Sequence, residues 1–447
     1  MGKLLVYLKD YKKESVLGPL FKLLEASFEL IVPLVMAAII DHGVVDGDKP
    51  YIMKMCLVLV LLAVIGLTCS ITAQYFAAKA AVGFSTGLRH ALFEHIQKLS
   101  FSEMDTVGTS TLITRMTSDI NQTQNGVNLV LRLFLRSPFI VFGAMIMAFT
   151  IDVKAALVFV VTIPLLSVVV FGIMLVSIPL YKKVQSALDK VLGITRENLT
   201  GSRVIRAFNK EEDEITDFNN SNDALTKIQL YVGKISALMN PLTYVIINGA
   251  VVVLVWTGAI RVNSGYITQG EVVALVNYMS QILVELIKLA NLIININKSI
   301  ACGNRIQAIF ELQPSITDHA VTPVAEEKTE HSGEVPEVVF SHVGLTYAGA
   351  GEESLTDIDF TVKKGETVGI IGGTGSGKSS VVNLIPRFYD ATKGSVQIGG
   401  KDVREYSLEE LRGKIGMVLQ KAVLFKGTIR ENMLWGNENA TDEDIMQ

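Results

Sequence analysis

Six long apolar stretches dominate the N-terminal part of the chain. They cover residues 17–40, 53–81, 127–150, 155–180, 241–260 and 272–300. A helix needs about 20 mostly apolar residues to cross the hydrocarbon core of a bilayer, and each stretch meets that length. The pattern predicts six transmembrane helices, several of them long enough to tilt or to continue beyond the membrane.

The connections between these stretches alternate between short and long. Residues 41–52, 151–154 and 261–271 are short, whereas residues 82–126 and 181–240 are long, polar and rich in helix-forming residues. Connections of that length are not simple turns. We expect each to form two antiparallel helical arms that reach about 30 Å or more from the membrane, at 1.5 Å per residue.

Basic residues distinguish the two sides of this predicted membrane domain. The short connections hold one each, Lys49, Lys154 and Arg261, whereas four precede the first stretch and the two long connections hold three and nine. Basic residues gather on the cytoplasmic side of membrane proteins. We therefore expect a multi-pass protein of the plasma membrane, with both termini and both long connections in the cytoplasm.

The composition agrees with a membrane protein in contact with lipid. Apolar residues make up 49% of the chain and charged residues 19%, with a mean hydropathy of +0.40. The net charge of −4 gives no support for nucleic-acid binding. Cys56, Cys69 and Cys302 lie in or beside apolar stretches without metal-ligand spacing, so neither a zinc site nor a disulfide framework is predicted.

The composition changes after residue 310. Residues 311–336 form a polar, proline-containing segment that we interpret as a linker, and residues 337–447 alternate strand-like runs with glycine-rich turns. The predicted fold class is an all-α six-helix transmembrane domain in residues 1–310, followed by a partial α/β P-loop NTPase domain in residues 337–447.

A phosphate-binding motif lies in the second domain. Residues 372–379 read GGTGSGKS and match G-x-x-x-x-G-K-[ST]; the preceding Thr367–Ile371 is predicted to be a buried strand, and residues 380–385 a helix. The glycines allow backbone N–H groups to point at phosphate oxygens. Lys378 would reach the β- and γ-phosphates of ATP, and the Ser379 hydroxyl would bind Mg²⁺. The predicted ATP-binding residues in this segment are Gly372, Thr374, Gly375, Ser376, Gly377, Lys378, Ser379 and Ser380.

With this motif, the whole chain resembles the ABC exporters that fuse six membrane spans to one nucleotide-binding domain. Tyr347, in VGLTYAGAG, is similar to the aromatic residue that stacks on adenine in this family, and Gln420, in GMVLQKAV, is similar to the Q-loop glutamine that touches Mg²⁺. Phe101–Ile120 and Glu197–Phe218 are similar to the two intracellular loops whose short helices dock on nucleotide-binding domains. The resemblance implies a dimer with a second, identical or different, half-transporter. Leu4–Val44 most resembles bacterial multidrug- or lipid-type members.

The family motifs that complete the ATPase site do not occur after Gln420. These are the LSGGQ signature, the Walker B strand with its glutamate, and the switch histidine, so no catalytic residue is assigned and the domain is interpreted as C-terminally incomplete. We expect this chain alone not to hydrolyse ATP. Two functions stay open. The first is a subunit of an ATP-driven exporter of an apolar or amphipathic drug, lipid or peptide. The second is a truncated, non-hydrolytic subunit that regulates or inhibits a full-length partner.

Several charged residues lie within the apolar stretches. Glu25 and Glu29 are four residues apart in the first stretch, and a carboxylate near the middle of a bilayer is costly unless it faces a cavity or a partner. They are candidates for a substrate cavity that favours cationic amphiphiles; the alternative is that both lie near the interface. Glu285 and Lys288 are expected to pair. Arg132 and Arg136 are expected to reach lipid headgroups.

Overall fold

The computed structural model describes residues 2–318, 335–421 and 423–446. Most of the predicted linker, residues 319–334, lies outside the described residues. The chain divides into two compact units, one of residues 1–97 with 110–311 and one of residues 98–109 with 312–447. We call them the membrane unit and the nucleotide unit and describe each by itself.

The membrane unit is helical. A 3₁₀ segment, Gly2–Tyr11, leads into the first helix, and π-helical turns occur at Ile39–Val44, Arg115–Asp119 and Val130–Phe134. The α-helices are α1 (Lys12–Ala38), α2 (Lys49–Lys98), α4 (Thr109–Thr114), α5 (Ile120–Leu129), α6 (Arg136–Ile151), α7 (Val153–Thr200), α8 (Ser202–Ala207), α9 (Glu211–Ala237), α10 (Met239–Asn263) and α11 (Gln269–Phe310).

Among the described residues of this unit, six continuous helical segments are long and apolar enough to cross a membrane, which confirms the predicted number of spans. They are Gly2–Val44, Lys49–Lys98, Thr109–Ile151, Val153–Thr200, Glu211–Asn263 and Gln269–Phe310. α2 alone has 50 residues. At 1.5 Å per residue it is about 75 Å long, more than twice the thickness of the hydrocarbon core. The predicted arms are therefore direct extensions of the spans.

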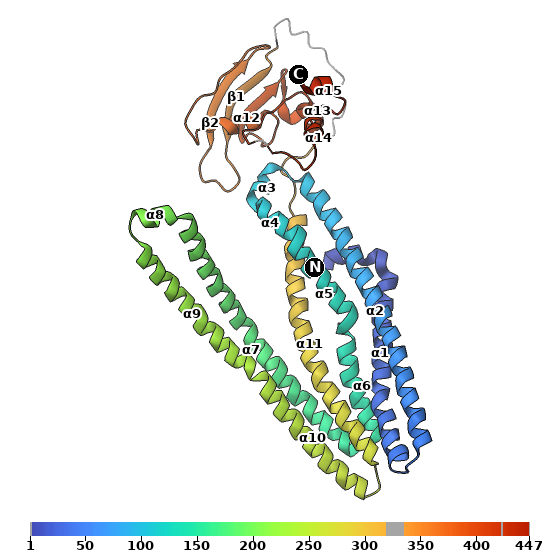
Figure 1. Ribbon diagram of the computed structural model, residues 1–447. Coiled ribbons are helices and arrows are strands. Elements are labelled where there is room, and N and C mark those ends of the chain that lie inside the picture. The colour runs from blue at the N-terminus through green and yellow to red at the C-terminus, as the bar shows by residue number, and fades with distance from the viewer. Residues whose placement is uncertain (1, 319–334, 422, 447) are drawn as a thin grey trace. The chain divides into compact units, whose positions relative to one another are not determined.

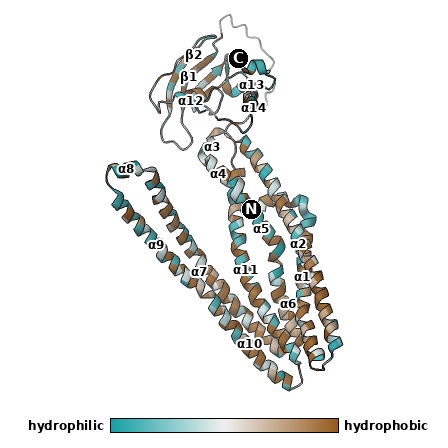
Figure 2. Cartoon of the chain, in the orientation of Figure 1, coloured by the Kyte–Doolittle hydropathy of each residue, from teal (hydrophilic) through white to brown (hydrophobic). Residues whose placement is uncertain are grey.

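The long helices form two groups within the membrane unit. α7 and α9 run side by side, are joined by α8, and diverge from the group that contains α1, α2, α5 and α11 (Figure 1). The groups meet where α7 and α10 pack with α6 and α11. Apolar residues predominate along this end of the helices, and polar residues are more frequent toward the arms (Figure 2).

A buried hydrogen bond and small side chains hold the helices together in the core where the two groups meet. The Tyr278 hydroxyl, fully buried on α11, donates a hydrogen bond of 2.6 Å to the Leu30 carbonyl of α1. Alanines at helix interfaces let backbones approach each other in lipid. The buried alanines of this core are Ala26, Ala37, Ala144, Ala148, Ala155, Ala156, Ala250 and Ala274.

The end of the first helical segment is attached to the start of α11. Asp41 accepts hydrogen bonds from the Gly270 backbone N–H at 2.8 Å and from the Thr268 hydroxyl at 2.6 Å. A Cβ atom at Gly270 would lie 2.3 Å from the Ala37 carbonyl oxygen, so only glycine fits this close approach. This contact holds the end of the first helical segment against the start of α11.

The nucleotide unit contains α3 (Phe101–Val107) and a four-stranded antiparallel sheet. The strands are β1 (Val338–Leu345), β2 (Leu355–Val362), β3 (Lys393–Ile398) and β4 (Lys401–Asp402), in the order β2-β1-β3-β4. β1 pairs Phe340 with Phe360 of β2 and with Val396 of β3. The remaining helices are α12 (Lys378–Leu384), α13 (Leu408–Gly413), α14 (Ile429–Met433) and α15 (Asp442–Met446). Val381 and Leu384 of α12 pack into the core beneath the sheet.

The prediction of a buried strand at Thr367–Ile371 is wrong for this structure. The segment has no regular structure, and Ile371 is 95% exposed. A strand needs a neighbour with which to exchange backbone hydrogen bonds. Among the described residues, the four strands of the sheet pair with one another and none of them pairs with this apolar segment.

Candidate functional site

The P-loop closes around the side chain of Lys378. The Lys378 ammonium donates to the carbonyls of Gly372 at 3.0 Å and Gly373 at 2.7 Å, and to the Ser376 hydroxyl at 3.3 Å. Gly375 and Gly377 have φ angles of 84° and 85°, which residues with a Cβ rarely adopt. The glycines thus allow the turn that leads directly into α12 at Lys378.

A cavity of about 420 Å³ lies beside this loop. It is lined by Tyr347, Glu353, Ser354, Gly375, Ser376, Gly377, Lys378, Ser379 and Ser380. Gly372 does not line the cavity, but its carbonyl accepts a hydrogen bond from Lys378, which does. Thr374 and Gln420 are exposed and do not line the cavity. The structure therefore brings together most of the residues predicted for ATP, but not the Q-loop glutamine.

Tyr347 connects the cavity to a second aromatic residue. Its hydroxyl donates to the Ser380 hydroxyl at 2.8 Å. Its ring meets the Tyr389 ring in an edge-to-face arrangement, with centroids 5.0 Å apart and planes at 90°. Aromatic pairs prefer this geometry.

Tyr389 was not identified from the sequence. Its hydroxyl donates to the carboxylate of Asp105 on α3. Its neighbour Phe388 packs against Phe101 of the same helix, with ring centroids 4.6 Å apart and planes tilted by 40°. Burial and, secondarily, the hydrogen bond to Asp105 raise the pKa of the Tyr389 hydroxyl, so it stays protonated and donates at neutral pH. The only sequence signal was the aromatic pair that follows the P-loop helix in RFYD.

The backbone before this pair is held in an unusual conformation. Arg387 has a φ of 52°, although it is not glycine. Its guanidinium is buried and binds both oxygens of Asp390, at 2.8 and 3.2 Å, and its carbonyl accepts a bond from Arg412. A left-handed residue persists only where its surroundings fix it. These contacts fix the direction in which Phe388 and Tyr389 leave α12.

The membrane unit has a cavity of its own, of about 470 Å³, between α1 and α11. Its lining is apolar on α1, except for Glu29, and largely polar on α11. The lining residues are Glu29, Val32, Pro33, Met36, Asn277, Ser280, Gln281, Val284, Glu285 and Lys288. The buried Oε1 atom of Gln281 has no hydrogen-bond partner among the described residues.

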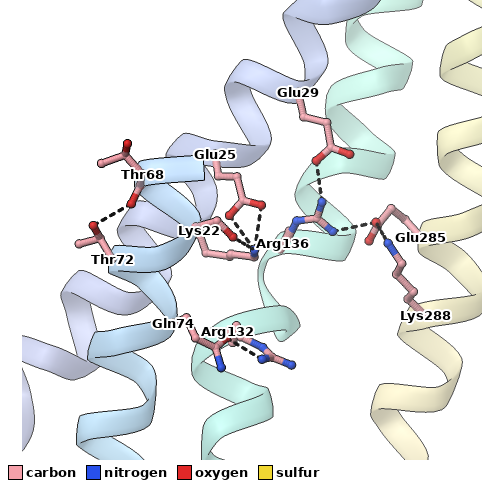
Figure 3. A network of polar contacts seen from close by, with 11 residues as sticks. Lys22, Glu25, Glu29, Thr68, Thr72, Gln74, Arg132, Arg136, Glu285 and Lys288 are labelled. Carbon is pink, nitrogen blue, oxygen red and sulfur yellow. Dashed lines mark hydrogen bonds and ion pairs between the residues drawn. The ribbon is translucent and has the colours of Figure 1, made fainter. Parts of the chain in front are cut away.

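An ion cluster lies at this cavity and joins three helices (Figure 3). Arg136 of α6 donates to Glu285 of α11 at 2.8 Å and to Glu29 of α1 at 2.6 Å. Glu285 also accepts from the Ser137 hydroxyl at 2.8 Å and pairs with Lys288 at 2.9 Å, as predicted. The prediction that Arg136 reaches lipid headgroups is wrong: its side chain is only 9% exposed, because two carboxylates bind it inside the helix bundle.

The other charged residues of the apolar stretches lie outside this cavity. Glu25 pairs with Lys22 at 2.6 Å, and Lys22 also donates to Ser70 at 3.3 Å. Arg132 donates to Gln74 at 2.6 Å. Of the two glutamates predicted at a substrate cavity, the structure places Glu29 in the lining, but not Glu25.

Two family models match the chain. The model of the ABC transporter transmembrane region matches residues 15–286, and the ABC transporter model matches residues 355–447. An uncharacterized ABC transporter ATP-binding protein of Mycobacterium tuberculosis is 34% identical over 96% of this chain and 73% of its own length. A putative multidrug export ATP-binding/permease protein of Bacillus subtilis is 31% identical over 100% of this chain and 77% of its own length. An ATP-dependent lipid A-core flippase of Desulfotalea psychrophila is 31% identical over 80% of this chain and 61% of its own length.

Proposed function

The chain belongs to the ABC transporter family, as a multi-pass membrane subunit of the exporter type that carries an ATP-binding domain, and from this premise we propose how it works. It binds ATP with Mg²⁺ in the cavity beside Lys378 and exports an apolar or amphipathic substrate as one half of a dimer. The nucleotide unit faces the cytoplasm, on the side where the basic residues of the long connections gather.

The arrangement of Lys378 carries the nucleotide part of this proposal. Among the described residues, its ammonium is bound by two carbonyl oxygens and one hydroxyl oxygen of the loop. A polyphosphate offers stronger, charged acceptors to the same group. The cavity is large enough for a ligand of several heavy atoms and has the Tyr347 ring in its wall. Adenine would stack on this ring while the phosphates reach Lys378.

The residues of the cavity fit a nucleotide-bound Mg²⁺ ion in one respect. Mg²⁺ usually binds substrate phosphates, waters and one or two protein oxygens. The Ser379 hydroxyl lies in the lining and supplies one such oxygen. Gln420 does not line the cavity, so we assign the protein contact to Ser379 alone.

The cavity between α1 and α11 supports an amphipathic substrate. Val32, Pro33 and Met36 form its apolar wall, and α11 supplies a polar wall opposite. Arg136 contacts only Oε2 of Glu29, whose side chain is 40% exposed. Together with the unpartnered acceptor of Gln281, Glu29 favours a substrate that carries hydrogen-bond donors, such as an ammonium group.

Nucleotide binding to the purified full chain in nanodiscs tests the proposal directly. A fluorescent ATP analogue should bind and be displaced by ATP. Lys378→Ala should lower the affinity by at least about tenfold, because a charge-assisted contact to phosphate is lost. Lys364→Ala, an exposed lysine outside the cavity, is the matched control and should leave the affinity unchanged. Equal binding by wild type and Lys378→Ala would contradict the proposal.

A further inference from the structure

We infer that the cavity between α1 and α11 selects a zwitterionic amphiphile, whose ammonium group binds Glu29 and whose anionic group binds Lys288. The inference rests on the proposed function of this cavity and names the charges that its substrate carries. Glu29 and Lys288 both line the cavity, which has a volume of about 470 Å³.

The ion cluster beside the cavity is a row of four charges that alternate in sign (Figure 3). Arg136 donates to Glu29 at 2.6 Å and to Glu285 at 2.8 Å, and Lys288 donates to Glu285 at 2.9 Å. The row contains two carboxylates and two cations, so its formal charges cancel. It therefore presents a negative end at Glu29 and a positive end at Lys288, without a net charge.

The two inner ions of the row are enclosed. The side chains of Arg136 and Glu285 are only 9% and 4% exposed. Both oxygens of Glu285 are occupied, Oε1 by Arg136 and Lys288 and Oε2 by the Ser137 hydroxyl. A ligand in the cavity therefore meets the two outer ions rather than the inner pair.

The two outer ions have room for a further partner. The side chains of Glu29 and Lys288 are 40% and 51% exposed. Within the part of the chain that the structure describes, Glu29 accepts only from Arg136, through Oε2, and Lys288 donates only to Glu285. A carboxylate has two acceptor oxygens and an ammonium has three donors. Each outer ion can thus bind a charged ligand group and keep its present partner.

A ligand with one charge matches only one end of the row. A cation is attracted to Glu29 but repelled by Lys288, and an anion meets the reverse. A zwitterion complements both ends, and such complementarity determines specificity. The apolar wall of Val32, Pro33 and Met36 provides space for an alkyl group, so the preferred ligand is amphipathic as well as zwitterionic.

Binding of short-chain probes to the full chain in nanodiscs tests the inference, after subtraction of binding to empty nanodiscs. Octylphosphoethanolamine and N-octylglycine are zwitterions that carry the two charges in opposite order from the alkyl chain. Octylammonium, octyl phosphate and octyl glucoside are a cation, an anion and a neutral amphiphile. At least one zwitterion should bind about tenfold more tightly than all three of these, because it makes a charge-assisted contact at both ends of the row.

Substitution of each outer ion should change the order of affinities in its own direction. Glu29→Gln should weaken binding of the zwitterion and of octylammonium by about fivefold or more, but not binding of octyl phosphate. Lys288→Met should weaken binding of the zwitterion to a similar extent without weakening binding of octylammonium. Glu285 keeps Arg136 and Ser137 as partners in this variant. A general loss of folding would weaken all probes alike, so it cannot imitate these opposite changes.

Lys298→Met is the matched control for Lys288→Met. Lys298 is exposed on the same helix and does not line the cavity. This variant should bind every probe as the wild type does. Lys288→Arg retains the positive charge and should keep part of the preference for the zwitterion.

The same titrations separate the inference from the proposed function. If the wild-type chain binds none of the probes, the proposed substrate cavity and the inference both fail. If it binds amphiphiles, but neither zwitterion more tightly than octylammonium, only the inference fails. Unchanged affinity of Lys288→Met for the zwitterion would overturn the inference as well.

Discussion

Arg136 and Glu285 form an ion pair of 2.8 Å between α6 and α11, although 149 positions separate them in the sequence. Their side chains are 9% and 4% exposed. The same guanidinium binds Glu29 of α1. One side chain thus ties three helices together beside the cavity.

Removal of Arg136 should destabilise the membrane unit. Loss of one partner of a buried pair costs about 3–5 kcal/mol, because the other charge stays buried without compensation. Arg136→Met should therefore lower the thermal unfolding temperature of the purified chain markedly. Arg136→Lys should restore only part of it, since one ammonium does not reproduce the fork of a guanidinium. The double variant Arg136→Met with Glu285→Gln should be more stable than Arg136→Met alone. An unchanged unfolding temperature in Arg136→Met would show that the pair contributes little.

Substitution of Gly377 should weaken nucleotide binding more than substitution of Gly373. Gly377 has a φ of 85°, and a Cβ atom there would lie 2.6 Å from Leu355 Cδ2. A Cβ at Gly373 would meet nothing within 4 Å. The strain in Gly377→Ala is of the order of 1–3 kcal/mol, which corresponds to a loss of affinity of about fivefold to 150-fold if all of it opposes binding. Titration of both variants with the fluorescent ATP analogue measures the difference, and equal affinities would contradict the expected role of Gly377.

Glu29→Gln should alter which amphiphiles are transported. The change keeps an oxygen near Arg136 but removes the negative charge from the cavity lining. We expect transport of cationic amphiphiles to fall several-fold relative to transport of neutral ones. The measurement uses proteoliposomes that contain the chain together with the second half-transporter of its dimer. Glu25→Gln is the control, because Glu25 pairs with Lys22 outside the cavity. The cavity would not select cations if the two variants transported all substrates alike.

The stability of the nucleotide unit should fall slightly as pH rises above about 6.5. The carboxylates of Asp357 and, more distantly, Asp359 raise the pKa of His342 above its ordinary value of 6.5. A raised pKa in the folded state stabilises the protein below the unfolded-state pKa, and this contribution is lost as pH rises through the folded-state pKa. The effect is small because both partners are exposed.

His342→Asn isolates this effect, because asparagine tolerates the φ of 49° at this position. At pH 6 the thermal unfolding temperature of the variant should be lower than that of the wild type. The difference between the two temperatures should be smaller at pH 9. A difference that stays constant over this range would assign the effect to packing rather than to the charge of His342.

The features that local sequence determines were predicted well. Six spans follow from the length of the apolar stretches, because the bilayer imposes that length. The helix after the P-loop follows from Lys378 and the glycines before it, since these residues fix the local backbone.

Features that depend on distant partners were not predicted. The position of Arg136 depends on Glu29 and Glu285, which lie on other helices, so the sequence alone suggested lipid headgroups instead. Thr367–Ile371 has the composition of a buried strand, but burial requires a neighbouring strand that composition does not report. Tyr389 was missed because its contacts are made with distant residues. Its hydroxyl donates to Asp105, 284 positions away, and its ring packs against Tyr347 on another loop.

The π-helical turn Val130–Phe134 lies directly before Arg136. Such a turn contains one residue more than the α-helical turn it replaces, and its wider winding absorbs that residue without changing the rotational phase of the helix that follows. Insertion or deletion of one residue in the regular helix α5, by contrast, would rotate Arg136 by about 100°. The ion cluster is thus sensitive to insertions and deletions upstream, even where every charged side chain is retained.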